Sequence, residues 1–522
     1  MTAPPGQHPH PHPLPPLAGG TAGPAALRPL LATVLDALGT GARDRNGPLP
    51  PGGPGSVTAR LTTTLGDVFP AHGTGDDEAL RTLVRALAAG AADPADPRCL
   101  AHLHCPPLAV AAAADLAASA LNPSLDSWDQ APAASALEAL VTRTLARHLY
   151  DTPDTPDTPT PGSPVPGSPV PGTSHARTLD PRSPAPHIPD PGTANARTAN
   201  ARTADPRTPD PDALVTTGGT EANQLALLLA RERHGPVRLV HGANAHHSLP
   251  RAAWLLGLPT PLTLPTPDGT LHPDTLDRAL TDHPGPTLVA ATAGTTDAGL
   301  IDPLADLAAV CAAHRTELHI DAAYGGLLAF SPRHRPLLNG LQHAHSITLD
   351  LHKLGWQPAA AGLLAVPDRH LLAPLHHQAD YLNAEDDTDA GLPDLLGRSL
   401  RTTRRPDILK IAATLRSLGR DGLAALIDRT CATAHRLAEL LDNHPHFEIH
   451  APPTISTVLF RPTHLPDTRI AALRRTLLHD GHAVLGRATA DGRLWLKATL
   501  LNPHTTTRDL HDLVKLLEGS IR

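Results

Sequence analysis

The segment SITLDLHK, residues 346–353, is a short apolar run that ends on a lysine. Lysine is rare in this chain, because only four of its 43 basic residues are lysines. The run has the length of a buried strand, and a similar run upstream, LHIDAA, contains Asp321 where its apolar part ends. Because parallel strands end at the same edge of a sheet, we expect Asp321 and Lys353 to lie close together at that edge.

Short apolar runs alternate with helical segments between about residues 213 and 367. The expected strands are VRLVHG, PTLVAATAG, ELHIDAA, SITLDLH and GLLAVP, each closed by Gly, Pro or polar residues. Between them, EANQLALLLARERHG, PRAAWLLGL and LADLAAVCAAH have the apolar spacing of helices. This alternation is typical of an α/β protein with a mainly parallel sheet and right-handed crossovers.

The rest of the chain divides by composition. Residues 1–24 predict a disordered tail, and residues 25–150 predict a mainly helical segment. Residues 151–212 hold short tandem repeats rich in Pro, Thr and Asp, which bury too little apolar surface to fold. We predict a disordered insert there, with a docking segment as the alternative. Residues 213–428 form the expected large domain, and residues 429–522 the expected small α+β domain.

Composition argues against several classes of protein. The net charge is −8 without long single-sign blocks, so we expect no nucleic-acid partner and no polybasic membrane patch. We see no signal-peptide pattern and no apolar run of membrane-spanning length. The four cysteines lack CxxC spacing, which predicts reduced thiols in a cytoplasmic protein. The run HPHPHP could bind a metal ion, but its prolines favour a disordered tail, and we expect no metal site.

The segment TTGGTEAN, residues 216–223, precedes a helical run. Backbone N–H groups at a helix start can bind a phosphate, and Gly218 and Gly219 leave the approach free of side chains. Thr220 adds a hydroxyl group. There is no Walker-type GK[ST] sequence, and an ordinary tight turn is the alternative interpretation.

Asp321 and Lys353 suggest chemistry rather than packing. A carboxylate at the end of a buried strand needs a cationic partner, which could be a protonated ring nitrogen or, in the alternative, a structural ion pair. A lysine amine can condense with an aldehyde, whereas a guanidinium stays protonated. A phosphate cradle, a carboxylate and a lysine are what pyridoxal 5′-phosphate requires. His246 or His247, in NAHHSLPRAAW, offers an imidazole to stack on the ring, although a structural histidine is the usual reading.

Five ordered motifs carry a family resemblance. TTGGTEAN, HHSLPRAAWLLGL, ATAGTTDAGLIDPL, HIDAAYGG and SITLDLHK resemble the motifs of group II pyridoxal-phosphate-dependent amino acid decarboxylases. The likeness runs from about Asp96 to the C-terminal segment LKATLLNPHTTTRDL, and the 151–212 insert interrupts it. LDSWDQAPAASALE and LKATLLNP look most like the diaminobutyrate and siderophore-type branch. The resemblance implies a fold-type-I enzyme with pyridoxal phosphate as cofactor and a homodimeric assembly.

The resemblance also implies a role for each matching residue. Lys353 would hold the cofactor aldehyde as an imine, and Asp321 would pair with the pyridine nitrogen. Ala323 and His246 would pack on opposite faces of the ring, and Thr292 would lie near the ring hydroxyl. The phosphate would be held by Gly218, Gly219, Thr220 and His352.

The expected reaction is decarboxylation of an L-amino acid to the amine and CO2. By resemblance, Tyr381 in a loop would serve the protonation step that follows loss of CO2. The acidic residues of that loop, Glu385, Asp386, Asp387 and Asp389, point to a diamino acid substrate such as L-2,4-diaminobutyrate, unless the loop is merely solvated. The alternatives are another reaction on the same cofactor, transamination or oxidative deamination, and a non-catalytic scaffold. One departure is AHSIT, where His345 replaces the family's usual acid.

Overall fold

The computed structural model describes residues 14–150, 209–377, 379, 382 and 384–521. Most of the predicted tail, nearly all of the predicted insert and Tyr381 lie outside the described residues. Helical structure begins at Gly23, close to the predicted start of the helical segment, and the first strand begins at Asp212.

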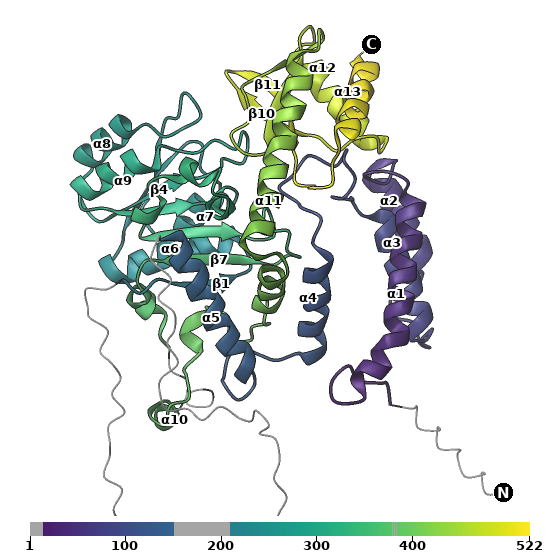
Figure 1. Cartoon of the computed structure of the whole chain (residues 1–522), viewed down its shortest axis with the longest axis horizontal. Coiled ribbons are helices and arrows are strands. Elements are labelled where there is room, and N and C mark those ends of the chain that lie inside the picture. The colour runs from purple at the N-terminus through teal and green to yellow at the C-terminus, as the bar shows by residue number, and fades with distance from the viewer. Residues whose placement is uncertain (1–13, 151–208, 378, 380–381, 383, 522) are drawn as a thin grey trace, which may run out of the picture. The chain divides into compact units, whose positions relative to one another are not determined.

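A seven-stranded sheet lies at the centre of the large domain, in the order β1-β7-β6-β5-β4-β2-β3. Figure 1 labels its strands β1, β4 and β7. The predicted mainly parallel sheet is confirmed, because β2, β3, β4, β5 and β6 pair in parallel. β7 is antiparallel to both of its neighbours, since the link of residues 351–361 is too short for a crossover between parallel strands. The strands are β1 (Asp212–Thr216), β2 (Arg238–Gly242), β3 (Leu262–Leu264), β4 (Thr287–Thr292), β5 (Glu317–Asp321), β6 (Ser346–Asp350) and β7 (Gly362–Val366).

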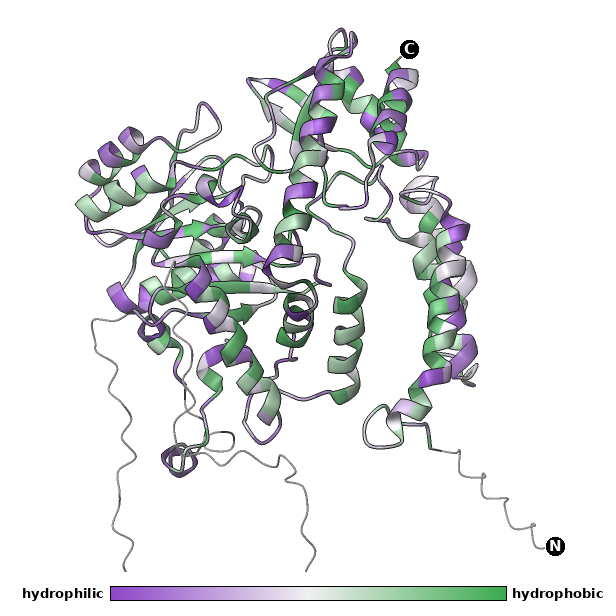
Figure 2. Cartoon of the chain, viewed as in Figure 1, coloured by the Kyte–Doolittle hydropathy of each residue, from purple (hydrophilic) through white to green (hydrophobic). Residues whose placement is uncertain are grey.

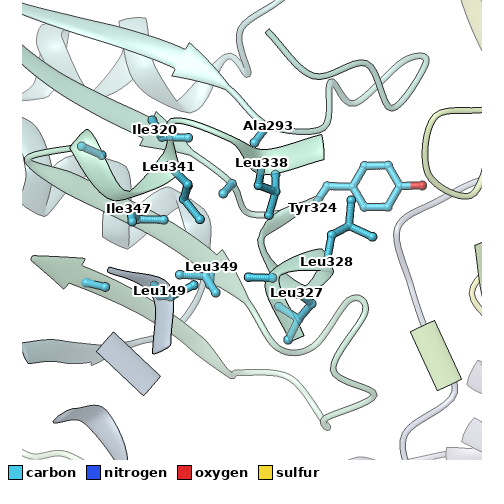
Figure 3. Packing of buried hydrophobic residues seen from close by; sticks show 14 of the residues in the cluster. Leu149, Ala293, Ile320, Tyr324, Leu327, Leu328, Leu338, Leu341, Ile347 and Leu349 are labelled. Carbon is cyan, nitrogen blue, oxygen red and sulfur yellow. The ribbon is translucent and has the colours of Figure 1, made fainter. Parts of the chain in front are cut away.

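Helices and 3-10 turns flank this sheet. The five predicted strands and the three helices predicted between them are present, whereas β1 and β3 were not predicted as strands. Figure 3 shows Ile320 of β5 and Ile347 and Leu349 of β6 packing among leucines of the flanking segments. The flanking elements are α6 (Gly219–His234), α7 (Ser248–Leu255), α8 (Pro273–Asp282), α9 (Leu304–Ala313), η1 (Gly326–Phe330), η2 (Arg335–Leu338), η3 (Leu341–His343) and η4 (Arg369–Leu375).

The N-terminal part is helical, as predicted. Its helices are α1 (Gly23–Arg45), α2 (Gly53–Leu65), α3 (Asp76–Gly90), α4 (Ala109–Leu121) and α5 (Pro132–Leu149). α4 is hydrophobic along most of its length (Figure 2), and α5 adds Leu145 and Leu149 to the core of the large domain. Segment 91–108, between α3 and α4, brings Leu103 to the cavity described below.

The C-terminal part forms a second core around a four-stranded antiparallel sheet in the order β10-β11-β9-β8. A long helix, α11, leads from the large domain to this sheet and is kinked at Gly419, whose φ of 64° is non-helical. Phe460 and Leu496 of the sheet and Leu437 of α11 belong to this core. The elements are α10 (Glu385–Asp389), η5 (Leu396–Arg398), α11 (Ile408–Asp442), β8 (Phe447–Ile449), β9 (Thr457–Pro462), α12 (Asp467–His479), β10 (Gly486–Ala490), β11 (Arg493–Thr499) and α13 (Thr507–Ile521).

Candidate active site

The turn between β1 and α6 presents the start of a helix to a cavity of about 350 Å³. A Cβ atom on Gly219 would lie 3.0 Å from the Ala323 side chain, and one on Gly218 would lie 3.0 Å from His352. Only glycine fits this approach without displacing a neighbour. The N–H groups of the first turn of α6 are therefore unobstructed, which is the arrangement that binds an anion.

The structure brings together all of the described residues that the sequence assigned to cofactor binding. The cavity is lined by Gly218, Gly219, Thr220, His246, Thr292, Asp321, Ala323, His352 and Lys353. They come from the ends of β1, β4, β5 and β6 and from the segment after β2, so five separate parts of the sequence meet at one edge of the sheet.

Lys353 follows β6 and points its ammonium group at a carboxylate. Its Nζ lies 2.9 Å from Oδ2 of Asp350, the last residue of β6, and its side chain is 18% exposed. The Nδ1 atom of His352, the residue before Lys353, lies 3.1 Å from the Ala361 carbonyl oxygen and 3.3 Å from the Ala361 nitrogen, and burial lowers the pKa of its imidazole. Lys353 is thus held inside the cavity and not on the protein surface.

Asp321 ends β5 and is 5% exposed. Its Oδ2 accepts a hydrogen bond of 2.8 Å from the Asn223 amide, and its Oδ1 accepts one of 3.1 Å from the Ala323 N–H. Within the described part of the chain, no basic side chain forms a salt bridge with Asp321. Two donors stabilise the carboxylate, but its charge has no cationic partner among these residues.

His246 is the histidine of the HH pair that lines the cavity. Its Nδ1 lies 2.8 Å from the Ser248 hydroxyl, and burial lowers the pKa of its ring. His247 is exposed and meets the His246 ring edge-on, with ring centroids 4.2 Å apart. Of the two histidines, His246 is therefore the one placed to contact a ring bound in the cavity.

Several residues in and around the cavity were not predicted. Asn223 and Asp350 line it, together with Leu103, Thr217, Gly294, Thr296 and Tyr324. A polar residue at every second position of a buried strand could have revealed Asp350, because Ser346, Thr348 and Asp350 share one face of β6. Asn223 could have been found from its spacing, one helical turn after Gly219 on the face of α6 that meets the sheet.

Other predicted features lie away from the cavity or outside the described residues. The acids Glu385, Asp386, Asp387 and Asp389 are exposed in and around α10 and do not line the cavity. His345 accepts the Leu318 N–H at 3.1 Å and has a structural place before β6. Tyr381 falls outside the described residues, so its role stays a prediction.

Metal and thiol chemistry have little support in the described part of the chain. No group of three or more His, Cys, Asp or Glu side chains there could hold a metal ion. All four cysteines are unpaired, and burial raises the pKa of the Cys105 thiol, which contacts the His352 carbonyl, to about 12. No helix among the described residues is long and apolar enough to cross a membrane.

The fold and the cavity define a class of protein, the fold-type-I pyridoxal-phosphate enzymes. The family model for the pyridoxal-dependent decarboxylase conserved domain matches residues 201–463. L-2,4-diaminobutyrate decarboxylase of Rhizobium meliloti is 37% identical over 473 residues, covering 87% of this chain and 84% of the relative. The enzyme of the same name from Acinetobacter baumannii is 27% identical over 80% of this chain and 78% of its own.

A solved structure gives the same result. The glutamate decarboxylase domain of diaminobutyrate-pyruvate transaminase and L-2,4-diaminobutyrate decarboxylase from Vibrio parahaemolyticus matches with a TM-score of 0.76 at 27% identity, over 97% of both chains. The chain belongs to the pyridoxal-dependent decarboxylase family. It is an amino acid decarboxylase, a carboxy-lyase that uses pyridoxal 5′-phosphate.

The cavity fits this cofactor. The glycine turn leaves room for a phosphate that a Cβ atom would fill. The buried charge of Asp321 suits a protonated ring nitrogen, and Lys353 is within the same cavity for the aldehyde. Thr292 Oγ1 is buried without a hydrogen-bond partner in the described residues, which suits a polar ring substituent.

Proposed function

We propose that this enzyme decarboxylates L-2,4-diaminobutyrate to propane-1,3-diamine and CO2. The proposal is supported by the relatives of that name, one of them 37% identical over most of both chains. The described cavity residues include no Phe or Trp, and the one Tyr among them is Tyr324, whose hydroxyl bonds Ser456 and Thr457. A small aliphatic substrate suits such a lining better than a bulky aromatic one.

We propose the following roles in the site. Lys353 binds the cofactor aldehyde covalently, and Asp321 holds a proton at the ring nitrogen. His246 and Ala323 pack against opposite faces of the ring, and Thr292 donates to the ring hydroxyl. The phosphate is bound by Gly218, Gly219, Thr220 and His352.

The bound cofactor supplies an electron sink for the electron pair that stays on Cα when CO2 leaves. The residues of the chain make that sink effective. Asp321, buried and stabilised by two N–H donors, favours the charged ring. Asp350 at 2.9 Å gives the Lys353 ammonium a counter-ion beside the site. Tyr381 would return a proton to Cα, as the family resemblance implies, and Tyr381→Phe should slow release of the amine while leaving substrate binding intact.

The single observation that carries the reaction is the meeting of Lys353, Asp321 and the glycine turn in one cavity. The test is a panel of L-amino acids with CO2, amine and keto acid measured in parallel. We expect equal amounts of CO2 and propane-1,3-diamine from 2,4-diaminobutyrate and no keto acid. Faster turnover of glutamate or tyrosine would refute 2,4-diaminobutyrate as the preferred substrate. Formation of keto acid without CO2 would favour transamination or oxidative deamination.

We also propose that the enzyme is a cytoplasmic homodimer. A groove of about 610 Å³ between α1 and α4 is lined mainly by apolar side chains, and Leu35, Leu116 and Leu121 remain exposed in it. Exposed apolar surface of this kind favours burial against a second copy. Light scattering should give twice the chain mass, and Leu121→Glu should shift the population toward monomer. A wild-type monomer at all concentrations would refute the dimer. The unpaired cysteines are consistent with a reducing compartment.

A further inference from the structure

Asn223 is a buried amide that uses all of its hydrogen-bonding capacity. It is 1% exposed and lies on α6, one turn after Gly219. Its Oδ1 lies 2.8 Å from the Thr348 hydroxyl and 3.0 Å from Nε2 of His319. Its Nδ2 donates to Oδ2 of Asp321 at 2.8 Å and to the Ser248 hydroxyl at 2.9 Å. An asparagine amide has two donors and two acceptor lone pairs, and each has a partner here.

The neighbours of Asn223 allow only one orientation of the amide. His319 is fully buried on β5, and burial lowers the pKa of its ring to about 4, so the ring is neutral. The Asp321 carboxylate can only accept, so the Asn223 NH2 group faces it and the Asn223 Oδ1 faces Nε2 of His319. His319 therefore donates from Nε2–H, and its Nδ1 accepts from the Ser346 hydroxyl at 2.8 Å. A flipped amide would place its NH2 group against the donors of His319 and Thr348 and its oxygen against the Asp321 carboxylate. Both contacts would be repulsive, and each would leave a buried polar group unsatisfied.

The fixed amide acts on two groups of the site at once. One N–H stabilises the carboxylate form of Asp321. The other N–H occupies a lone pair of the Ser248 oxygen. Nδ1 of His246 accepts the Ser248 backbone N–H at 3.3 Å, so this nitrogen carries no proton and the Ser248 hydroxyl donates to it at 2.8 Å. A neutral His246 then carries its proton on Nε2, and its ring is held in one orientation.

We infer that Asn223 is a positioning residue that couples Asp321 to His246, setting the carboxylate as a hydrogen-bond acceptor and fixing the tautomer and orientation of the imidazole. The inference rests on the proposed roles of Asp321 and His246 at the cofactor ring. His319 and Thr348 belong to the same hydrogen-bond network, because they hold the Asn223 amide in the required orientation. Asn223 touches neither reacting atoms nor substrate in this scheme and acts through its two partners.

The main test measures the cofactor and not the turnover. Pyridoxal 5′-phosphate labelled with 15N in the ring is bound to the full-length protein, and the ring-nitrogen chemical shift and the dissociation constant are recorded. We expect the wild-type ring nitrogen to be protonated. Asn223→Ala should move the shift toward the unprotonated value and weaken cofactor binding about tenfold to a hundredfold, the range for losing a hydrogen bond to a charged group. Ser248→Ala should leave the ring-nitrogen shift unchanged and alter only the hydrogen bond and the orientation of the His246 ring.

Asn223→Asp gives a second test that a purely structural role would not pass. The titratable groups that face this position are His319 and Asp321 of β5, whereas Thr348 of β6 and Ser248 of α7 do not titrate. The new carboxyl group can donate to Asp321 while protonated, but it repels Asp321 once ionised. A like charge raises the pKa of such a carboxyl, so cofactor affinity should fall with rising pH in this variant and not in the wild type. If Asn223→Ala does not fold, Asn223→Asp still tests the inference.

Asn502 offers a matched control. It is buried, its amide donates to the Ala95 carbonyl at 2.7 Å, and it does not line the cavity. Asn502→Asp should lower thermal stability without a pH-dependent change in cofactor affinity. An unchanged ring-nitrogen shift in Asn223→Ala, or a pH profile of Asn223→Asp equal to that of the control, would overturn the inference. Asp321→Asn distinguishes a failure of this inference from a failure of the proposed function, because an unchanged ring-nitrogen shift in Asp321→Asn would refute the proposed role of Asp321 itself.

Discussion

Replacing Asp321 by asparagine removes a charge from the site with almost no change of shape. The amide oxygen of the Asp321→Asn variant can still accept from the Ala323 N–H, which donates to the wild-type carboxylate at 3.1 Å, whereas the hydrogen bond from the Asn223 amide to the second carboxylate oxygen is lost. The wild-type side chain is 5% exposed, so water screens its charge poorly. The variant should therefore fold and keep its cavity while losing the anion that we propose faces the ring nitrogen.

The size of the effect follows from the lost attraction. Two opposite unit charges about 4 Å apart interact by about 4 kcal/mol at an effective dielectric constant of about 20. Since about 1.4 kcal/mol corresponds to a tenfold change in rate, decarboxylation should fall about a thousandfold. Cofactor binding should weaken less than turnover, because the glycine turn and Lys353 are unchanged.

The assay compares CO2 release, cofactor affinity and thermal unfolding for wild type and variant. Asp302→Asn is the control, because Asp302 is also a buried carboxylate, 2% exposed and held by the N–H groups of Leu271 and Thr292, but does not line the cavity. It should lose stability with a much smaller loss of turnover. A rate for Asp321→Asn within about tenfold of wild type would refute the electrostatic reasoning.

Three further predictions concern other parts of the structure. Lys353→Arg keeps a cation beside Asp350 but cannot condense with an aldehyde, so the yellow absorbance of the bound cofactor and the turnover should both vanish; a yellow, active variant would refute the role of Lys353. Glu138→Gln should cost about 3–5 kcal/mol of stability in thermal unfolding, because it leaves Arg404 buried and charged without the carboxylate that it now bonds at 2.9 and 3.0 Å. His319 has a pKa of about 4 in the folded protein, below its usual 6.5, so protons favour the unfolded chain and this residue lowers stability as the pH falls from 6.5 to about 4. His319→Gln should flatten that part of the stability profile relative to wild type, and an equal slope would contradict the assignment.

Local signals in the sequence were sufficient for much of the fold. Five of the seven strands of the central sheet were predicted, because each is an apolar run closed by a breaker. The remaining two are β1, which lies beside the unusual composition of the insert, and β3, which spans only three residues. The antiparallel β7 was not foreseen, because the direction of a strand depends on the length of the link before it, not on its own composition.

The site residues that could be predicted are those whose residue type has few other uses at such a position. Lys353 and the glycine turn are of this kind. Asn223 and Asp350 were missed because polar residues near a helix start or a strand end have many ordinary uses. Their importance appears only when β5, β6 and α6 are side by side, so that His319, Thr348 and Asn223 share their hydrogen bonds.

Tyr324 links the two sheets of the enzyme. It lies three residues after Asp321, and its hydroxyl bonds the Ser456 and Thr457 hydroxyls at 2.8 and 3.0 Å, across 132 and 133 positions of sequence. Burial raises the pKa of this phenol to about 12, so it remains a neutral hydrogen-bond partner at neutral pH. A hybrid enzyme that takes its C-terminal part from a relative must therefore supply hydroxyl groups at the positions of Ser456 and Thr457 to bond Tyr324. A swap made at the boundary between the sheets without them would leave a buried phenol without its partners, three residues from Asp321.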